Sequence, residues 1–208
     1  MLGILWCNGD VPSKNLIQHV ISIGDRVFGI DGGADKAYSA EIIVERVLGD
    51  LDSVDISKWK NKTEYLSNQE MSDFAKSVIH LMEKGFTEIE VIGIDGGSPE
   101  HILGIWGALA ELPGDVRIKL HHESRTTYRI HPDDEDTEIF IKKGEEFSIF
   151  ALTPCKEVFL KGSKWEIEGE KLSLSTRGLH NIGIGRNISI KADGVIALII
   201  QKGHISLL

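Results

Sequence analysis

Short apolar runs alternate with helical patterns through the first 125 residues. Several of these runs end in Asn, Asp or Gly, as expected where a buried strand opens into a polar loop. This alternation is typical of βαβ units around a largely parallel sheet. It predicts strands at residues 3–7, 26–30, 45–48, 63–66, 88–94 and 117–121.

Two segments of this half carry clear helix signals. In "SDFAKSVIHLMEKG" Ser72 can cap the N-terminus, apolar residues recur on one face, and Gly85 can end the helix. Pro99 suits a first helical position, and the apolar segment after it runs to a stop at Pro113. We therefore predict helices that begin near Ser72 and Pro99.

The pattern changes near the acidic run "HPDDEDTE", residues 131–138. After it, segments such as "EEFSIFAL", "KEVFLKG" and "NISIKADGVIALIIQKG" alternate apolar and polar positions, which predicts an antiparallel sandwich or barrel. We interpret the acidic run as a solvated connection or hairpin tip. The expected fold is thus an α/β, Rossmann-like domain over residues 1–125, followed by a β-sandwich domain over residues 126–208.

Composition and net charge limit the classes of function that the chain can have. With 41% hydrophobic and 26% charged residues the chain has an ordinary globular composition, and its net charge of −9 argues against a nucleic-acid or anionic-membrane surface. Cys7 and Cys155 are far apart and lack metal-ligand spacing, which favours buried thiols in a reducing compartment. No apolar run reaches membrane length and no basic segment precedes the first one, so we expect a cytoplasmic protein.

Carboxylates gather where the predicted strands end. Side chains alternate along extended chain, so Asp50 and Asp52 of "GDLDS" should lie on one side, a pair that suits Mg²⁺. Asp73 should stand in the first turn of its helix, where it could bind the same ion or merely stabilise the helix. Because the carboxyl ends of parallel strands share one crevice, we favour a metal site formed by all three.

Two glycine pairs, Gly32-Gly33 and Gly96-Gly97, each follow an aspartate at a strand end and precede a helix. Glycine there permits positive φ and lets backbone N–H groups approach a phosphate at a helix N-terminus. Either pair alone is weak evidence for a phosphate site, because glycine is common in strand-to-helix turns. Beside the acidic cluster, both pairs indicate a site for a nucleotide polyphosphate.

His121 and His122 lack a partner at metal spacing, and we interpret them as surface or hydrogen-bonded residues.

These motifs, in this order, resemble the thiamine pyrophosphokinase family. "DGGAD" is similar to the family's Asp-Gly-Gly-Ala-Asn, "GDLDS" to its Gly-Asp-x-Asp-Ser, and "QEMSDFAK" to its Gln-Asp-x-Thr-Asp-Phe-x-Lys. "GSKWEIEGEKLSLSTRGLHN" resembles its Gly-Leu-x-Trp segment and later Ser-Asn. The resemblance implies an N-terminal domain that binds ATP and Mg²⁺, and a sandwich that contributes to the thiamine site across a homodimer interface. It also implies transfer of a pyrophosphoryl group from ATP to thiamine, which gives thiamine diphosphate and AMP.

Matching positions give each candidate residue a role. Mg²⁺ would be held by Asp50, Asp52 and Asp73, while Asp31 and Glu100 would lie near the reacting groups. Trp165 is the candidate aromatic wall for thiamine, although a half-buried strand tryptophan explains it nearly as well. The other candidates are nucleotide contacts at Gly32, Gly33, Gln69, Lys76, Gly96, Gly97, Ser98 and His101, and thiamine contacts at Ser175, Thr176, His180 and Asn181.

The chain departs from the family pattern at three of these positions. Ser98 and Glu100 stand where the family has arginine and aspartate, and His180 replaces a serine. Serine cannot neutralise phosphate in a bidentate way, and Arg177 or Arg186 could supply the lost charge. Two alternatives therefore stay open: a pyrophosphokinase for another hydroxymethyl heterocycle, such as a pterin alcohol, and a non-catalytic nucleotide-binding or thiamine-binding homologue.

Overall fold

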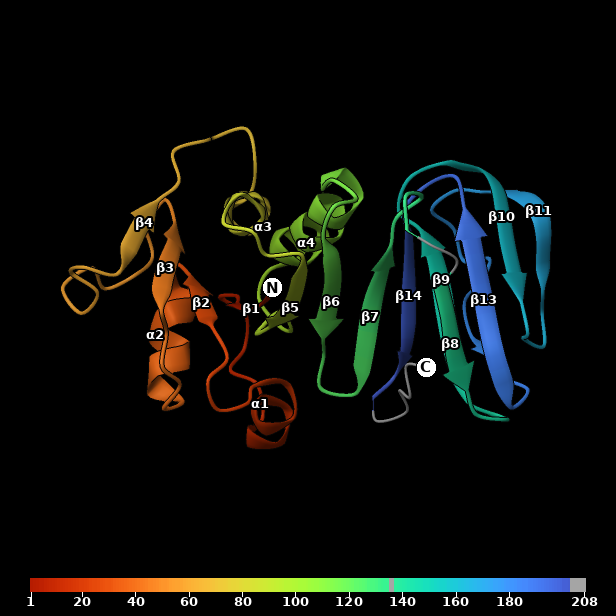
Figure 1. Ribbon diagram of the computed structural model, residues 1–208, viewed down its shortest axis with the longest axis horizontal. Helices are drawn as coiled ribbons and strands as arrows, with labels where there is room; N and C mark the ends of the chain where they lie inside the picture. Colours follow the sequence, from red (N-terminus) through yellow and green to blue (C-terminus); the bar gives the residue numbers. More distant parts are fainter. Residues whose placement is uncertain (135–136, 203–208) are drawn as a thin grey trace. The chain divides into compact units, whose positions relative to one another are not determined.

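The computed structural model describes residues 1–134 and 137–202 and divides the chain into two compact units, Met1–Glu123 and Ser124–Leu208. The first unit combines helices with parallel strands, and the second consists of antiparallel strands. The fold class expected from the apolar pattern is therefore confirmed. Figure 1 shows the elements of each unit along the chain.

A six-stranded parallel sheet forms the centre of the first unit, in the order β6-β5-β1-β2-β3-β4. Its middle strands are almost completely buried, as their uninterrupted apolar runs require in a sheet covered on both faces. The strands are β1 (Leu2–Trp6), β2 (Val27–Ile30), β3 (Arg46–Gly49), β4 (Thr63–Tyr65), β5 (Glu88–Ile92) and β6 (Arg117–His121). All six lie where the sequence predicts strands, within two residues at each end.

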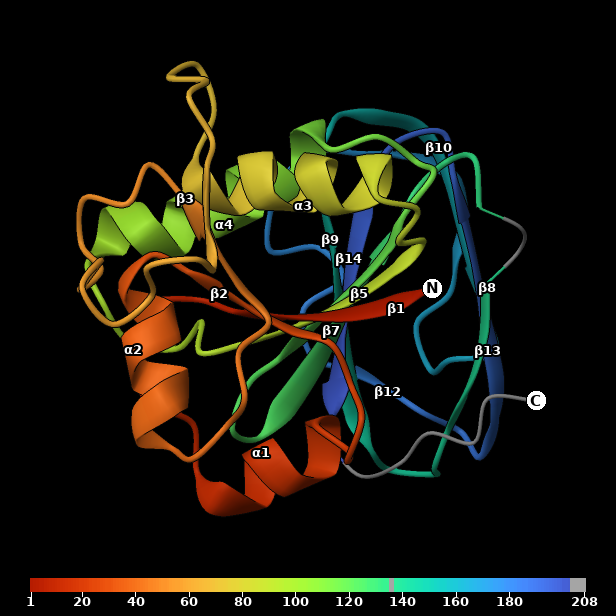
Figure 2. The ribbon, with the colours of Figure 1, turned by 60° about the vertical axis from the view of Figure 1, so that its left-hand side comes forward.

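Helices cover both faces of this sheet. Figure 2 shows α3 (Asp73–Glu83) and α4 (Pro99–Glu111) on one side of the strands, and α1 (Lys14–Val20) and α2 (Gly32–Ser39) on the other. Ser72 caps α3, because its hydroxyl oxygen accepts a hydrogen bond from the Ala75 N–H at 3.2 Å. Pro99 occupies the first turn of α4. Both predicted helices are thus confirmed.

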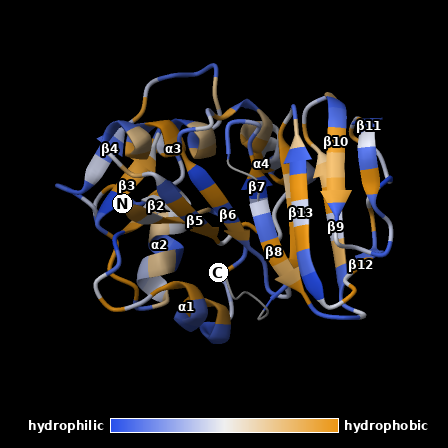
Figure 3. Ribbon diagram, turned by 45° about the vertical axis from the view of Figure 1, so that its right-hand side comes forward, coloured by the Kyte–Doolittle hydropathy of each residue, from blue (hydrophilic) through white to orange (hydrophobic). Residues whose placement is uncertain are grey.

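The second unit is a sandwich of two antiparallel sheets, with strand orders β12-β9-β14-β7 and β11-β10-β13-β8. Inward-facing aliphatic residues from both sheets form one core, and β10 and β13 show the alternation of hydrophobic and hydrophilic positions in Figure 3. The strands are β7 (Arg125–Ile130), β8 (Thr137–Ile141), β9 (Glu146–Ala151), β10 (Cys155–Lys161), β11 (Ile167–Leu172), β12 (Asn181–Ile182), β13 (Arg186–Ala192) and β14 (Ile196–Gln201).

The acidic run lies between β7 and β8, in the region expected to be a connection. Its residues 135 and 136 lie outside the described part of the chain. β7 itself gave no clear sequence signal, because its segment "RTTYRI" is mostly polar although Thr126, Thr127 and Arg129 are buried. A buried polar strand does not produce the alternation on which strand prediction depends.

Candidate active site

Three carboxylates meet at the carboxyl edge of the parallel sheet. Asp31 follows β2, Asp50 follows β3, and Asp73 is the first residue of α3. One carboxylate oxygen from each lies within 4.8 Å of the others. Oxygen ligands at this spacing suit a hard divalent cation such as Mg²⁺.

The backbone around Asp31 is shaped to place its carboxylate in this cluster. Asp31 has a φ of 45°, which non-glycine residues rarely adopt, and Leu51 at 64° donates its N–H to Asp31 Oδ1 at 2.9 Å. Gly49 has a φ of 137°, and a Cβ there would lie only 2.3 Å from Asp31 Oδ1. Glycine at position 49 therefore makes the room that the Asp31 carboxylate occupies. Such local strain is typical of functional sites.

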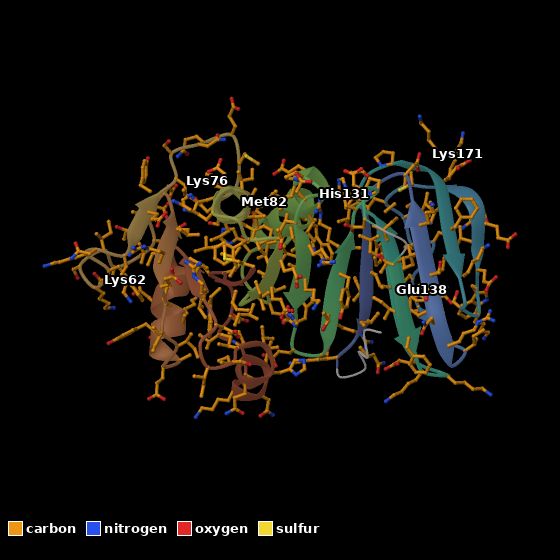
Figure 4. The ribbon with its side chains drawn as sticks, viewed as in Figure 1. Lys62, Lys76, Met82, His131, Glu138 and Lys171 are labelled. Carbon is orange, nitrogen blue, oxygen red and sulfur yellow. The ribbon has the colours of Figure 1, made fainter. Side chains whose placement is uncertain are left out.

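Asp73 is held from two directions. Its Oδ1 accepts a hydrogen bond from the Asp50 N–H at 3.2 Å and an ion pair from Lys76 Nζ at 2.7 Å. Lys76, labelled in Figure 4, is buried on α3, and its Nζ also donates to the Leu66 carbonyl at 3.2 Å. The Lys76 ammonium thus contacts one carboxylate of the cluster and orients Asp73. It is absent from the lining of the adjoining cavity, although the sequence placed Lys76 among the nucleotide contacts.

Burial raises the pKa of Asp31 to about 6. The carboxylates of Asp73, Asp50 and Asp52 contribute to this rise in pKa, and the hydrogen bond from the Leu51 N–H opposes it. Asp31 is 5% exposed, so its negative charge is poorly hydrated. The ionised form of Asp31 is therefore less favourable than that of an exposed aspartate, and a bound cation would stabilise it.

The structure corrects the expected geometry of "GDLDS". Leu51 adopts the left-handed region, so residues 50–52 turn and do not continue as extended chain. The Asp52 N–H donates to Asp50 Oδ1 at 3.3 Å, as in a turn stabilised by an aspartate side chain. The expectation that Asp50 and Asp52 share one side of an extended segment is therefore wrong. Asp31 joins Asp50 and Asp73 in the cluster, while Asp52 lines the neighbouring cavity.

A cavity of about 490 Å³ adjoins the cluster. It lies against the loops that follow β1, β2, β3 and β5 and the first turns of α3 and α4. None of the described residues that line it is a lysine or an arginine. The lining comprises Cys7, Asn8, Gly9, Ile30, Asp31, Asp52, Ser53, Ser72, Asp73, Phe74, Gly93, Ile94, Gly96, Gly97, Glu100, His101, Gly104 and Ile105.

The two glycine pairs serve different purposes. Gly96 and Gly97 have φ values of 73° and 81°, as the sequence predicts for a turn that leads into a helix. Gly32 and Gly33 instead lie within α2 and lack positive φ, so that part of the expectation is wrong. A Cβ on Gly33 would lie 2.5 Å from the Trp6 carbonyl oxygen, which shows that this pair permits close packing of α2 on the chain after β1.

The remaining first-unit candidates lie around α4 and before α3. Glu100 and His101 line the cavity, and Ser98 precedes α4 without capping it. A hydrogen bond from Ser98 lowers the pKa of the exposed Glu100 carboxyl. Gln69 is exposed in the loop before α3.

Asn8 is a cavity residue that the sequence did not single out. Its carboxamide lies beside Gly32, where a Cβ would be 2.8 Å from Asn8 Nδ2. Lys36 fixes this loop by donating to the carbonyls of Asn8 and Gly9 at 2.8 and 2.6 Å. The loop has no motif of its own, and only its position after β1 could have indicated a role.

In the second unit, Asn181 organises the residues around Trp165. Asn181 is buried, its Nδ2 donates to the Trp165 carbonyl at 2.7 Å, and its Oδ1 accepts the Trp165 N–H at 3.2 Å. The indole itself is 52% exposed and carries Lys164 Nζ 4.4 Å from its ring centre. Ser175, Thr176 and His180 are also exposed. The structure therefore presents an accessible tryptophan and uses the Asn181 amide to hold its backbone.

We predict that Gly49→Ala destabilises the protein by about 2–4 kcal/mol, because the new Cβ combines left-handed strain with overlap on Asp31. Chemical denaturation measures this loss. Gly24→Ala is the matched control, since Gly24 also has positive φ, 96°, but a Cβ there meets nothing within 4 Å. An equal loss in the two variants would show that the contact with Asp31 contributes nothing.

Fold and site together define a class: a parallel α/β unit with a carboxylate cluster at its carboxyl edge, followed by an antiparallel sandwich. Residues 17–120, half of the chain, match the family model described as "Thiamin pyrophosphokinase, catalytic domain". The chain belongs to the thiamine pyrophosphokinase family, a family of kinases, as its sequence motifs indicated. Comparison with curated protein sequences finds no significant match.

Solved structures support the same fold over both units. Thiamine pyrophosphokinase from Bacillus subtilis superimposes with a TM-score of 0.77 at 19% identity, covering 97% of this chain and 99% of that one. Thiamin pyrophosphokinase from Candida albicans superimposes with a TM-score of 0.73 at 15% identity, covering 96% of this chain and 89% of that one. Yeast thiamin pyrophosphokinase superimposes with a TM-score of 0.70 at 16% identity, covering 99% of this chain and 86% of that one.

Within the described residues, no helix is both long and apolar enough to cross a membrane.

Proposed function

We propose that the chain is a thiamine pyrophosphokinase that transfers the terminal pyrophosphoryl group of ATP to the thiamine hydroxyl. The observation that carries this proposal is the convergence of Asp31, Asp50 and Asp73 beside a nucleotide-sized cavity. In the reaction, the hydroxyl oxygen bonds to the β-phosphorus and the bond from that phosphorus to the α–β bridging oxygen breaks. AMP leaves with the bridging oxygen, and the hydroxyl proton passes to water.

The residues present fit Mg²⁺. The donors are carboxylate oxygens, one of them is buried, and Gly49 lacks the Cβ that would fill the space taken by Asp31. Asp31, Asp50 and Asp73 would hold the ion, with Asp52 beside them on the cavity wall. When bound, Mg²⁺ supplies charge neutralisation on the transferring pyrophosphoryl group.

The chain's own groups would position the polyphosphate. The N-terminus of α4 and the glycine turn before it offer a positive helix end, and His101 is the basic side chain among the described lining residues. Lys76 would act by orienting Asp73. In-line transfer depends mainly on such positioning and on charge neutralisation, which makes a covalent nucleophile unnecessary.

The family resemblance also supports a cytoplasmic homodimer whose sandwich contributes to the acceptor site. The exposed indole of Trp165 is the strongest candidate there, because an aromatic face attracts a cationic thiazolium ring. Ser175, Thr176 and His180 are candidate polar contacts near it in sequence, and Asn181 would act by holding the Trp165 backbone.

A second candidate is a binding protein without turnover. It is favoured by Ser98 at the position of the family arginine and by the absence of lysine and arginine from the described cavity lining. This candidate predicts stabilisation by ATP and Mg²⁺ without formation of AMP. It also predicts that Ser98→Arg introduces turnover.

Product analysis tests the proposed function. Purified protein is incubated with ATP, Mg²⁺ and either thiamine or a pterin alcohol, and AMP is quantified by chromatography. We expect AMP and thiamine diphosphate in equal amounts with thiamine and no reaction with the pterin alcohol. AMP formed only with the pterin alcohol would show that the acceptor is a pterin alcohol. Stabilisation by ATP without formation of AMP would support the second candidate, a binding protein without turnover.

A further inference from the structure

A second, smaller pocket of about 220 Å³ adjoins the cavity that holds the acidic cluster. The two share Ile94, Gly96 and Ile105 as lining residues, so they lie side by side in the first unit. We call the smaller one the side pocket. It is lined by Ile94, Asp95, Gly96, Ile102, Ile105, Trp106, Leu120 and His122.

The side pocket is apolar and aromatic, whereas the main cavity is acidic. The rings of Trp106 and His122 are nearly parallel, at 14°, with centroids 6.5 Å apart. Asp95 fixes the histidine, because its Oδ1 lies 2.6 Å from His122 Nδ1, and its Oδ2 accepts the Glu123 N–H at 3.0 Å. Aliphatic and aromatic walls suit a planar ring, and the Asp95 carboxylate would repel a phosphate.

The position of the side pocket matches the length of a nucleotide. The acidic cluster follows β2 and β3, and the side pocket lies at the ends of β5 and β6. In the order β6-β5-β1-β2-β3 these places are three strand spacings apart, about 14 Å. An extended nucleoside triphosphate can cover that span. Between them lie the loops after β1 and β5, where the strand order reverses and open α/β sheets bind ligands.

We propose that the side pocket receives the nucleobase of the triphosphate, with the base against the Trp106 ring and the polyphosphate directed to Asp31, Asp50 and Asp73. This inference rests on the proposed function for the identity of the nucleotide. It assigns affinity for the base to Trp106 and the apolar residues of α4, and affinity for the polyphosphate to the main cavity beside the acidic cluster.

Calorimetric binding of ATP and of inorganic tripolyphosphate, each with Mg²⁺, tests the proposal on the full chain. Trp106→Leu is expected to weaken ATP binding by about tenfold, as loss of base stacking does elsewhere, and to leave tripolyphosphate binding unchanged. Trp106→Phe, which retains an aromatic face, should restore most of the affinity for ATP. Leu103→Ala is the matched control, because Leu103 lies on the same helix, is 70% exposed and does not line the side pocket.

Three results would overturn the proposal: unchanged ATP binding in Trp106→Leu, an equal loss for ATP and tripolyphosphate, or weaker thiamine binding with ATP binding intact. The AMP assay separates this inference from the proposed function. Wild-type protein that forms AMP, with ATP binding insensitive to Trp106, would overturn the inference alone. Protein that binds ATP through Trp106 but forms no AMP would overturn only the proposed function, and protein that binds no ATP would overturn both.

Discussion

Asp50→Asn is expected to reduce the rate of AMP formation by about a thousandfold, because it removes one charged ligand from the cation that neutralises the transferring group. Asp50 is suited to this test. Its carboxylate is half-buried and accepts the Asp52 N–H, which an asparagine oxygen can also accept. Steady-state rates at saturating Mg²⁺ and ATP measure the effect.

Two further aspartates serve as comparisons for Asp50→Asn. Asp52 lines the cavity but lies outside the trio, so Asp52→Asn should reduce the rate by only about tenfold. Asp55 is exposed and bonded to Ser57 and Lys58, and Asp55→Asn should leave the rate unchanged. A larger loss from Asp52→Asn than from Asp50→Asn would show that the metal ligands are not those that the structure brings together.

Asp31→Asn is expected to stabilise the metal-free protein by about 2–3 kcal/mol at pH 7.5 while abolishing turnover. The folded-state pKa of Asp31, about 6, lies above its ordinary value of 3.8. Below 3.8 the carboxyl is protonated in both states and costs nothing. As the pH rises to 6 the unfolded chain loses its proton first, so the wild-type free energy of unfolding falls, and above 6 the full cost is present. Asparagine has no such cost.

Urea denaturation in the presence of a chelator, from pH 4 to pH 7.5, measures this difference. The two proteins should have similar stability at pH 4 and diverge through pH 6. Added Mg²⁺ should raise the free energy of unfolding of the wild type at pH 7.5 and leave that of the variant unchanged, because a bound cation neutralises the buried Asp31 carboxylate. If the free energy of unfolding changes with pH in the same way for wild type and Asp31→Asn, ionisation of the Asp31 carboxyl does not destabilise the folded protein.

Local signals in the sequence were sufficient for the fold class and for most strands of the first unit. β1 and β2 are apolar runs of strand length, β5 and β6 alternate apolar and charged positions, and the helix from Asp73 begins after a serine cap, so local residues indicate these elements. β7 was missed because its burial depends on partners elsewhere in the sandwich. Polar residues that are buried by distant strands leave no local pattern.

The site could be predicted only in outline. Asp50 and Asp73 were identified because both follow recognisable strand and helix signals. The exchange of Asp52 for Asp31 in the cluster depends on the left-handed Leu51, whose N–H bonds to Asp31, twenty residues away in sequence. The side pocket was not predicted either, since Trp106 reads as an ordinary helix residue and His122 reveals its partner, Asp95, only in the folded chain.

The number of bound cations is the most direct test of a metal site at Asp31, Asp50 and Asp73. Manganese can replace magnesium among oxygen ligands, and its free form is quantified by electron paramagnetic resonance. We expect that the wild-type chain binds Mn²⁺ at the carboxylate cluster, that Asp50→Asn and Asp31→Asn each lose this binding, and that Asp55→Asn retains it. Wild-type binding that survives in both cluster variants would contradict the assignment of Asp31, Asp50 and Asp73 as the metal site.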